Sequence, residues 1–437
     1  MAAPLMSQSR FSVPVWKRPA EVASPGASRS NPARNEAVDV VVVGGGFLGL
    51  STALAAARKG MRVRVLEARS IGEGASGLNG GQVIPGLKYD PEWLLSHFGP
   101  QRGEALIDFA AHTADSVFDL IDAEKLDVPR QRNGWIQAAH TETALAAARE
   151  RDRQWQARGA DVKLLDAQEI AALTGTRNYV GGWWDRRAGV IDPLSFVSEL
   201  ARIAELAGVS ISENATVTAL RRSNGLWEAR TAYSGAVVKA RFAVVATNAY
   251  ADALIPGLAQ TLVPLHSFQI GTAPLPEALL AGILPQGQAV SDSRRILVYY
   301  RRSADGRLVL GGRGRMALPR SEGDWKHLHN AMLRLYPQLA GTAIEKRWFG
   351  RVALTPDHLP HIHEPQPGLL VAAGCQGRGV GLMTALGPRL ADYMTSGDPD
   401  GLPLPISPIK PIPFHAFRQV GIATTIAWYR FLDAMER

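Results

Sequence analysis

Residues 38–67 read VDVVVVGGGFLGLSTALAAARKGMRVRVLE, and this stretch decides how the chain folds. The β-branched run Val40 to Val43 predicts a buried strand, and the glycines that follow have the G-x-G-x-x-G spacing. An apolar helical segment and a second strand, Val63 to Leu66, complete the unit, which ends in the acidic residue Glu67. This order of elements within about thirty residues indicates a dinucleotide-binding βαβ unit: a strand, a glycine motif, a helix, a second strand and an acid.

Each part of the unit has a physical role in binding an adenine dinucleotide. Gly44 permits the tight turn, Gly46 lets the backbone approach a pyrophosphate, and Gly49 lets the helix pack closely on the strand. The helix N-terminus offers free N–H groups to the phosphates. Glu67 is expected to accept hydrogen bonds from a ribose 2′-OH. The cofactor-binding candidates in this unit are Gly44, Gly46, Phe47, Leu48, Gly49, Glu67 and Ala68.

A second glycine-rich segment follows the acid immediately. Residues 71–82 read IGEGASGLNGGQ, with five glycines in twelve residues. A simple nicotinamide-binding unit needs no such loop, whereas a long, flat isoalloxazine lying against backbone does, because side chains would obstruct its approach. The candidates here are Gly74, Ala75, Ser76, Asn79, Gly80, Gly81 and Gln82.

The GASGxNGGQ pattern of residues 74–82 resembles the second flavin-contacting loop of the D-amino acid oxidase superfamily of FAD-dependent oxidoreductases. It is most similar to the branch of gamma-glutamylputrescine oxidoreductase and the glycine (sarcosine) oxidases. The resemblance implies an α/β fold, in which an FAD-binding Rossmann-like domain of the glutathione-reductase type is interleaved with a substrate domain. The sheet of that substrate domain is expected to be mixed and largely antiparallel.

Later segments continue the resemblance. Residues 368–382 predict a buried strand, a glycine-rich turn and a helix, so that a second helix N-terminus points at the flavin. The strand ending in Thr247 and Asn248 resembles the family strand that returns to the nucleotide, and Val217 falls where relatives contact the adenine side through backbone atoms. These parts add Val217, Thr247, Asn248, Gly374, Gly377, Arg378, Gly379 and Val380 to the cofactor-binding candidates.

We therefore expect the chain to be divided as follows. Residues 1–37, rich in Ser, Pro, Ala and Arg, are expected to form a partly disordered arm. Segments 38–114, 189–250 and 354–437 are expected to form the FAD-binding domain, and 115–188 and 251–353 the substrate domain or cap. Helices are predicted at 100–127, 141–158, 193–207 and 322–336, and an imperfect amphipathic helix at 421–437.

Composition narrows the class of protein. At 437 residues and 47.0 kDa the chain is long enough for two domains. The only cysteine is Cys375, which indicates a cytoplasmic protein. The sequence contains no run of eighteen uncharged apolar residues, so no membrane span is predicted. The net charge is +8, but the basic residues are scattered, so nucleic acid is not an expected partner.

Candidates for contact with the substrate come mainly from the expected substrate domain. Tyr299 and Tyr300 alternate on a predicted strand, so only one of them can face the flavin, and Tyr300 is the favoured member. Because Arg301 would then point to the opposite face, the sequence leaves open which of Tyr300 and Arg301 faces the flavin. An arginine could hold a substrate carboxylate, and a tryptophan could pack over the ring. The candidates are His266, Tyr300, Arg301, Trp348, Arg351 and Gln376.

Two other sites are not expected. His358, His361 and His363 lie close together with Asp357, but their spacing matches no standard zinc pattern, so no metal is predicted. Cys375 does not occupy the position at which sarcosine oxidases tether their flavin, which falls near residues 352–353 here. FAD is therefore expected to be bound non-covalently.

The resemblance implies an FAD-dependent enzyme that oxidises a C–N bond to an imine, which hydrolyses to a carbonyl compound and an amine. The expected partners are a small-molecule amine or amino acid and an electron acceptor, O2 or a quinone or carrier protein. A polyamine derivative, an N-methyl amino acid and a D-amino acid all remain open as substrates. A flavin-bound subunit without catalysis, and a tRNA-modifying or hydroxylating enzyme, are the other classes considered.

Overall fold

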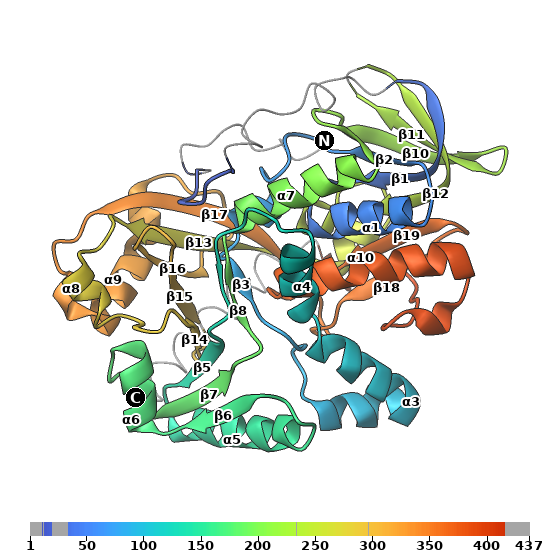
Figure 1. Cartoon of the computed structure of the whole chain (residues 1–437). Coiled ribbons are helices and arrows are strands. Elements are labelled where there is room, and N and C mark those ends of the chain that lie inside the picture. Colours follow the sequence, from blue (N-terminus) through green and yellow to red (C-terminus); the bar gives the residue numbers. More distant parts are fainter. Residues whose placement is uncertain (1–10, 12, 20–33, 233, 296, 416–437) are drawn as a thin grey trace.

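The computed structural model describes residues 11, 13–19, 34–232, 234–295 and 297–415. Within these residues the chain forms two large sheets that lie side by side, with helices against both (Figure 1). The expected helix at 421–437 lies outside the described residues, as does most of the expected arm.

The first sheet combines a parallel centre with antiparallel additions. Its main path runs β10-β11-β12-β1-β2-β9, and β19 pairs with both β12 and β18. The neighbours β19, β12, β1, β2 and β9 are all parallel. The strands are β1 (Glu36–Val43), β2 (Val63–Leu66), β9 (Ser210–Ser212), β10 (Val217–Ser223), β11 (Leu226–Thr231), β12 (Val237–Val245), β18 (His361–His363) and β19 (Leu369–Ala373).

The alternation of side chains in β1 explains why this strand is buried on both faces. Val40 and Val42 join the core that contains α1, whereas Val41 and Val43 join a separate core on the opposite face. Helix α1 packs against α10, so closely that a Cβ on Gly387 would lie 2.5 Å from the Cβ of Ser51. This helical layer includes α1 (Phe47–Arg58), α4 (Asp115–Ala123), α7 (Pro193–Leu206) and α10 (Gly379–Ser396).

The second sheet runs β17-β13-β16-β15-β14-β5-β7-β6, and only the β14–β5 pair is parallel. Its strands are β5 (Trp135–Ala139), β6 (Val162–Leu165), β7 (Gly181–Asp185), β13 (Val263–Thr272), β14 (Ala289–Asp292), β15 (Val298–Arg302), β16 (Leu308–Arg313) and β17 (Ile344–Leu354). A small sheet of β3 (Gln82–Val83), β8 (Gly189–Ile191) and β4 (Arg130–Gln131) lies between the large ones.

The remaining helices are α2 (Ala75–Leu78), α3 (Pro91–Ala111), α5 (Glu142–Gln156), α6 (Ala167–Thr174), α8 (Glu277–Leu280) and α9 (Lys326–Leu335). The helix expected at 100–127 is divided in two, because residues 100–111 belong to α3 and α4 follows separately. Helix α3 itself is kinked where Gly99 has a φ of 75° and precedes Pro100. Asp192 caps α7, accepting hydrogen bonds from the N–H groups of Leu194 and Ser195.

These observations confirm the α/β fold with a mixed, largely antiparallel second sheet. Helix α4 packs on α10 although its residues fall in the expected cap segment 115–188, whereas β5, β6 and β7 of that segment join the second sheet. The domain boundaries stay a prediction.

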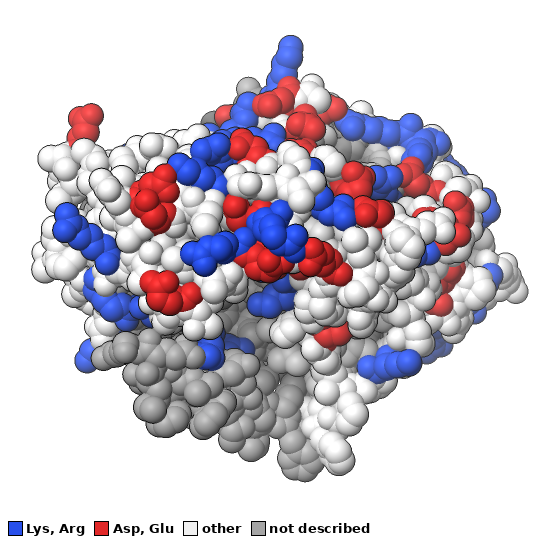
Figure 2. Space-filling view, turned by 90° about the horizontal axis from the view of Figure 1, so that it is seen from below, with Lys and Arg blue, Asp and Glu red and all other residues white. Residues whose placement is uncertain are grey.

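The molecular surface carries charges of both signs. On the face drawn in Figure 2, the described basic residues are interspersed with acidic ones and form no continuous stripe. Ion pairs such as Arg153–Glu92 and Arg158–Glu104 contribute to this mixture. Among the described residues, no helix is both long enough and apolar enough to cross a membrane.

Candidate functional site: a dinucleotide crevice and an arginine–tryptophan pocket

Four candidate segments meet because each follows the carboxyl end of one of four neighbouring parallel strands. Gly44 follows β1, Glu67 follows β2, Thr247 follows β12 and Gly374 follows β19. In a parallel sheet these ends lie along one edge, where nucleotides bind in open α/β folds. The N–H of Gly374 donates to Oδ1 of Asn248 at 3.0 Å, so segments more than a hundred residues apart are in direct contact.

The first glycine motif has the close approaches that its spacing predicts. Gly44 has a φ of 107°, and a Cβ there would lie 3.1 Å from the carbonyl oxygen of Ala246. A Cβ on Gly49 would lie 2.0 Å from the carbonyl oxygen of Gly44, which no real side chain allows. Helix α1 therefore begins at Phe47 with its N-terminus against the turn, and no acidic side chain lies in its first turn. This geometry fits a pyrophosphate.

Glu67 lies at the end of β2 with its carboxylate turned toward the glycine turn. Its Oε2 accepts the N–H of Gly45 at 2.7 Å, and its Oε1 accepts the N–H of Arg69 at 3.0 Å. Burial raises the pKa of Glu67 above its usual value, and these two hydrogen bonds oppose that shift. Since a carboxylate has about four acceptor positions, two hydrogen bonds leave capacity for ribose hydroxyls.

The second glycine-rich loop, residues 71–82, is tied to both sheets. Oγ of Ser76 accepts the N–H of Phe47 at 3.1 Å, which joins this loop to the N-terminus of α1. The side chain of Asn79 holds the loop together, donating to the carbonyl of Ser76 at 2.8 Å and accepting the N–H of Gly81 at 2.8 Å. The amide of Gln82 donates to the carbonyl of Val290 in β14 at 3.3 Å.

The other expected cofactor residues lie along the same edge of the first sheet. Leu48 is buried in α1, Ala68 follows Glu67, and Gly74 faces the ring of Tyr250. Val217 begins β10, next to the segment in which Ala215 donates to the carbonyl of Glu67 at 2.8 Å. The turn that contains Gly377 leads into α10 at Gly379 and Val380. Their contacts with FAD stay a prediction.

Two of the six substrate candidates contact the second loop instead of lining a pocket. Nε1 of the fully buried Trp348 donates to the carbonyl of Leu78 at 3.1 Å. Nη1 of Arg301 donates to the carbonyl of Gly81 at 3.0 Å and also to that of Ile191. Both side chains therefore hold backbone that the sequence assigns to the flavin site.

Tyr300 does not face the second loop, whereas Arg301 does. Which of the two faces the flavin stays a prediction. Its side chain is fully buried, with its hydroxyl 3.3 Å from that of Tyr179 and its ring edge-on to Tyr336. Tyr299 lies on the same face of β15 as Arg301: its ring is next to Gly80, and its hydroxyl is 2.8 Å from Oγ of Ser267. The expected orientation of Tyr300 therefore does not match the contacts with the second loop, which are made by Tyr299, and contact with the flavin stays a prediction.

The remaining candidates are distributed around the loops. His266 pairs with Arg351 across β13 and β17, and burial lowers the pKa of His266, so this imidazole is neutral at pH 7. The guanidinium of Arg351 lies 5.2 Å from the ring centre of Tyr250. Nε2 of Gln376 donates to Oγ1 of Thr355 at 2.5 Å, and its buried Oε1 has no hydrogen-bond partner among the residues that the structure describes.

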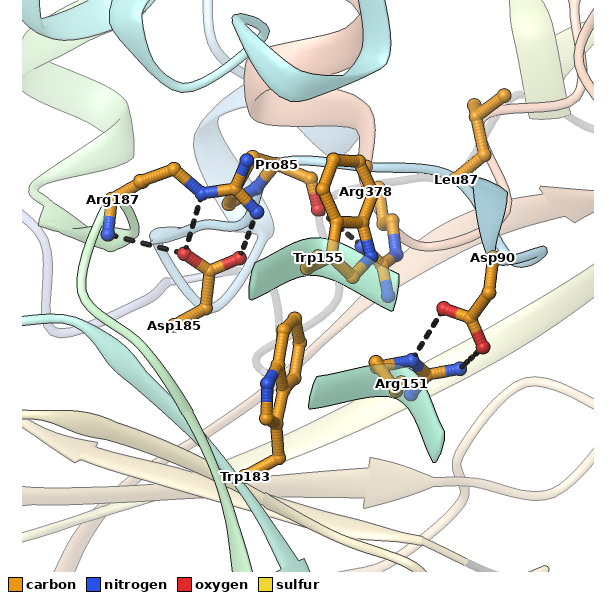
Figure 3. A pocket seen from close by; sticks show the side chains of 10 residues that line it. Pro85, Leu87, Asp90, Arg151, Trp155, Trp183, Asp185, Arg187 and Arg378 are labelled. Atoms are coloured by element: carbon orange, nitrogen blue, oxygen red, sulfur yellow. Dashed lines mark hydrogen bonds and ion pairs between the residues drawn. The ribbon is translucent and has the colours of Figure 1, made fainter. Parts of the chain in front are cut away.

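A pocket that the sequence did not predict lies where the second and third loops meet the second sheet. Its lining combines three arginines with two tryptophans and two aspartates from distant segments (Figure 3). The lining residues are Pro85, Gly86, Leu87, Asp90, Arg151, Trp155, Trp183, Asp185, Arg187 and Arg378.

Each arginine of the pocket lies over a tryptophan ring. The guanidinium carbons of Arg187 and Arg151 are 4.6 Å and 5.7 Å from the ring centres of Trp155 and Trp183, and that of Arg378 is 5.6 Å from Trp135. Such stacking is a favourable cation–π arrangement that fixes the guanidinium planes.

Two of these arginines are paired with carboxylates and one is not. Arg187 forms a two-pronged ion pair with Asp185 at 2.9 and 2.7 Å, and Arg151 pairs with Asp90 at 2.7 and 3.1 Å. Among the described residues, Arg378 has no carboxylate within ion-pair distance; its Nη1 donates to the carbonyl of Pro85. Burial, followed by the charge of Arg151, lowers the pKa of Arg378 to about 10.

The histidines near residue 360 have different hydrogen-bond partners. Nε2 of His361 is 2.9 Å from Oδ2 of Asp357, and Nδ1 of His363 is 2.7 Å from the carbonyl of Ser407. Within the described part of the chain, no group of three His, Cys, Asp or Glu residues is placed to hold a metal ion. The thiol of Cys375 is buried next to the third loop.

The carboxyl ends of the parallel strands, two helix N-termini and a buried acid form the arrangement that binds dinucleotides in open α/β folds. Residues 39–393 match the model of the FAD dependent oxidoreductase family, DAO. The chain belongs to this family, FAD is its cofactor, and it is an oxidoreductase.

Curated relatives support the family and the branch that the loop sequence indicated. The probable oxidoreductase OrdL of Haemophilus influenzae is 31% identical over 408 residues, which cover 91% of this chain and 92% of the relative. The gamma-glutamylputrescine oxidoreductase of Escherichia coli is 33% identical over 369 residues, covering 83% and 85%. The crystal structure of glycine oxidase from Geobacillus kaustophilus has a TM-score of 0.69 at 22% identity, covering 82% and 95%.

Proposed function

We propose that this protein oxidises the C–N bond of an amine or amino acid that carries a carboxylate, and that O2 is the electron acceptor. The imine product is hydrolysed by water to a carbonyl compound and an amine. Two electrons and two protons leave the substrate, and O2 takes them up to become H2O2. FAD, when bound, supplies the two-electron chemistry at the carbon that bears nitrogen.

The observation that carries the proposal is the position of Arg378. This residue precedes α10 in the third glycine-rich loop, and its guanidinium donates to the carbonyl of Pro85, just after the second loop. Since Arg378 has no carboxylate partner among the described residues, its guanidinium can donate two hydrogen bonds to the carboxylate of a substrate and form a bidentate ion pair. The neighbouring pairs Arg151–Asp90 and Arg187–Asp185 are internally neutralised, so they shape the pocket without competing for that carboxylate.

The cavity is about 10 Å³, the size that holds about one water molecule, so it would take only the carboxylate end of a substrate. Trp155 and Trp183 are each 3–4% exposed, and they form apolar walls beside the guanidinium groups (Figure 3). Such walls limit the access of water, which favours a neutral amine over its protonated form. The names of the gamma-glutamylputrescine oxidoreductase and glycine oxidase relatives describe amine or amino-acid substrates that also carry a carboxylate.

Two further properties belong to the proposal. FAD is held without a covalent bond, because the chain has a hydrophobic Val352 and Ala353 where sarcosine oxidases have their tethering cysteine. The enzyme works in the cytoplasm, since its single cysteine allows no intrachain disulfide.

The test is reduction of the bound flavin without oxygen, followed at about 450 nm, where oxidised flavins absorb. The substrates to compare are gamma-glutamylputrescine, sarcosine, proline and D-alanine, which carry a carboxylate, and putrescine, which does not. Bleaching by a carboxylate-bearing member and recovery on admitting air would support the proposal. Bleaching by putrescine alone would contradict the carboxylate requirement, and bleaching without recovery would contradict O2 as the acceptor.

A further inference from the structure

Residues 13–19, which we call the arm segment, cross the outside of the second glycine-rich loop. Trp16 is the centre of the contact: only 6% of its surface is exposed, and its Nε1 donates to the carbonyl of Asn79 at 2.8 Å. Its ring meets Trp348 edge-on, with centroids 5.9 Å apart, and the guanidinium carbon of Arg301 lies 4.8 Å from its ring centre. Trp16 therefore contacts the loop and both side chains that support it.

The next two residues fix the arm segment to the first turn of α7 and to the start of the loop. The N–H of Lys17 donates to Oδ2 of Asp192 at 3.2 Å, and its carbonyl accepts Oγ of Ser195 at 2.8 Å. Nη2 of Arg18 donates to the carbonyl of Ile71 at 2.5 Å. The arm segment thus holds the loop at residue 71 and again at residue 79.

The loop needs such contacts, because its five glycines lose more backbone freedom on ordering than other residues would. Five of its carbonyl groups accept hydrogen bonds from side chains outside the loop. The donors are Arg18 for Ile71, Gln269 and Trp348 for Leu78, Trp16 for Asn79, and Arg301 for Gly80 and Gly81. Two of the five carbonyl groups are held by the arm segment.

These contacts also set the direction of the loop's N–H groups. A trans peptide is planar, so the N–H of a residue points opposite to the preceding carbonyl. Because the carbonyl of Asn79 points at Trp16, the N–H of Gly80 points away from the arm segment. The carbonyl of Leu78, held by Trp348 and Gln269, orients the N–H of Asn79 in the same way.

We propose that the arm segment is a clasp that holds the second glycine-rich loop in its FAD-binding shape, with Trp16 as the positioning residue. The clasp rests on the FAD dependence of the family and not on the proposed substrate or acceptor. Without it, the loop still has Trp348 and Arg301 as partners, but Arg301 loses the ring that covers its guanidinium.

The test compares full-length variants in the FAD-loaded state. Trp16→Ala removes the indole donor and the ring, and Trp16→Phe removes the donor while keeping an aromatic ring. Phe11→Ala is the matched control, because Phe11 is also 6% exposed but packs on Trp325 within the core on the other face of the second sheet. The readouts are the rate of FAD dissociation and the hydrogen exchange of amides in residues 71–82.

We expect Trp16→Ala to speed FAD dissociation about tenfold and to raise exchange in residues 71–82, with a few-fold effect for Trp16→Phe. Phe11→Ala is expected to lower the melting temperature without changing either readout. If Trp16→Ala does not fold, a faster FAD release from Trp16→Phe than from Phe11→Ala still supports the clasp. Equal FAD release from all three variants and the parent would overturn it, whatever the substrate proves to be.

Discussion

Replacing Arg378 with methionine is the most direct test of how the pocket selects its substrate. Methionine has a similar length but no charge, so Arg378→Met removes the one pocket arginine that has no carboxylate partner among the described residues. A hydrogen-bonded contact with an ionised group contributes about 1.5–3 kcal/mol, and about 1.4 kcal/mol corresponds to a factor of ten. We therefore expect kcat/KM for a carboxylate-bearing amine to fall about tenfold to a hundredfold.

The same substitution has a small expected effect on stability, because two contributions offset each other. Removing a buried, unpaired charge is favourable, as the lowered pKa of Arg378 (about 10) indicates. Losing the hydrogen bond to the buried carbonyl of Pro85 is unfavourable by about 1–3 kcal/mol. Because these two contributions offset each other, we expect the melting temperature of Arg378→Met to lie within a few degrees of that of the parent.

The assay is the rate of flavin reduction under anaerobic conditions, measured for a carboxylate-bearing amine and for its counterpart without the carboxylate. The counterpart should lose less than about threefold, because it never formed the ion pair. Arg378→Lys keeps the charge but not the planar fork, so an intermediate loss is expected. Equal losses for both substrates, with FAD content unchanged, would refute the assignment of Arg378 as a carboxylate anchor.

Three further predictions concern the cofactor. Gly49→Ala places a Cβ 2.0 Å from the carbonyl oxygen of Gly44, far inside the van der Waals distance. We therefore expect this variant to lose FAD and to be destabilised by about 1–3 kcal/mol in thermal unfolding. Gly323→Ala, whose nearest contact would be Oγ of Ser321 at 3.4 Å, serves as its control and should leave both unchanged. Protonation of Glu67 removes acceptors for ribose, and burial raises the pKa of this carboxyl, so FAD affinity should weaken as the pH falls through a value above 4.5. Glu67→Gln should bind FAD weakly with no such pH dependence in a fluorescence titration. Acid precipitation should release the yellow colour into the supernatant, and colour kept in the pellet would show a covalent flavin.

The geometry of the first glycine motif could be predicted from the sequence because its contacts are local. The turn at Gly44, the packing of Gly49 and the acid at Glu67 all belong to one βαβ unit, whose hydrogen-bond pattern leaves few alternatives. The third loop was predictable for a related reason: a buried strand that ends in glycines must deliver them to the same edge of the parallel sheet.

The pocket was not predictable in this way, because each of its arginine–tryptophan pairs joins two segments that are distant in the sequence. Arg151 comes from α5, Arg187 follows β7, and Arg378 precedes α10. The tryptophan that each arginine contacts lies on a different element from that arginine, so no local sequence motif links the two. The adjacent Trp183 and Trp184 are a visible signal in the sequence, but alternation along β7 sends only Trp183 into the pocket.

The sequence left open which of Tyr300 and Arg301 faces the flavin, for a different reason. The side chains along β15 do alternate between the two faces of the sheet. This alternation does not tell which face meets the second glycine-rich loop. Burial gives no help, since Tyr300 and Arg301 are both buried. The deciding contacts are long-range: Tyr179 and Tyr336 take Tyr300 into the core beneath α9, which leaves Arg301 facing Gly81.

Arg301 and Arg378 show why charge alone does not identify a substrate anchor. Burial lowers the pKa of both arginines to about 10, although Asp192 opposes the shift at Arg301 and Arg151 adds to it at Arg378. Their hydrogen bonds differ: Arg301 donates to the carbonyls of Gly80, Gly81, Ile191 and Arg302, whereas the only protein acceptor found for Arg378 within the described residues is the carbonyl of Pro85. A guanidinium has five N–H donors, so Arg301 is committed to holding backbone while Arg378 keeps donors for a two-oxygen ligand. Because those donors lie between the two glycine-rich loops, a carboxylate bound there would place the rest of the substrate next to the cofactor site.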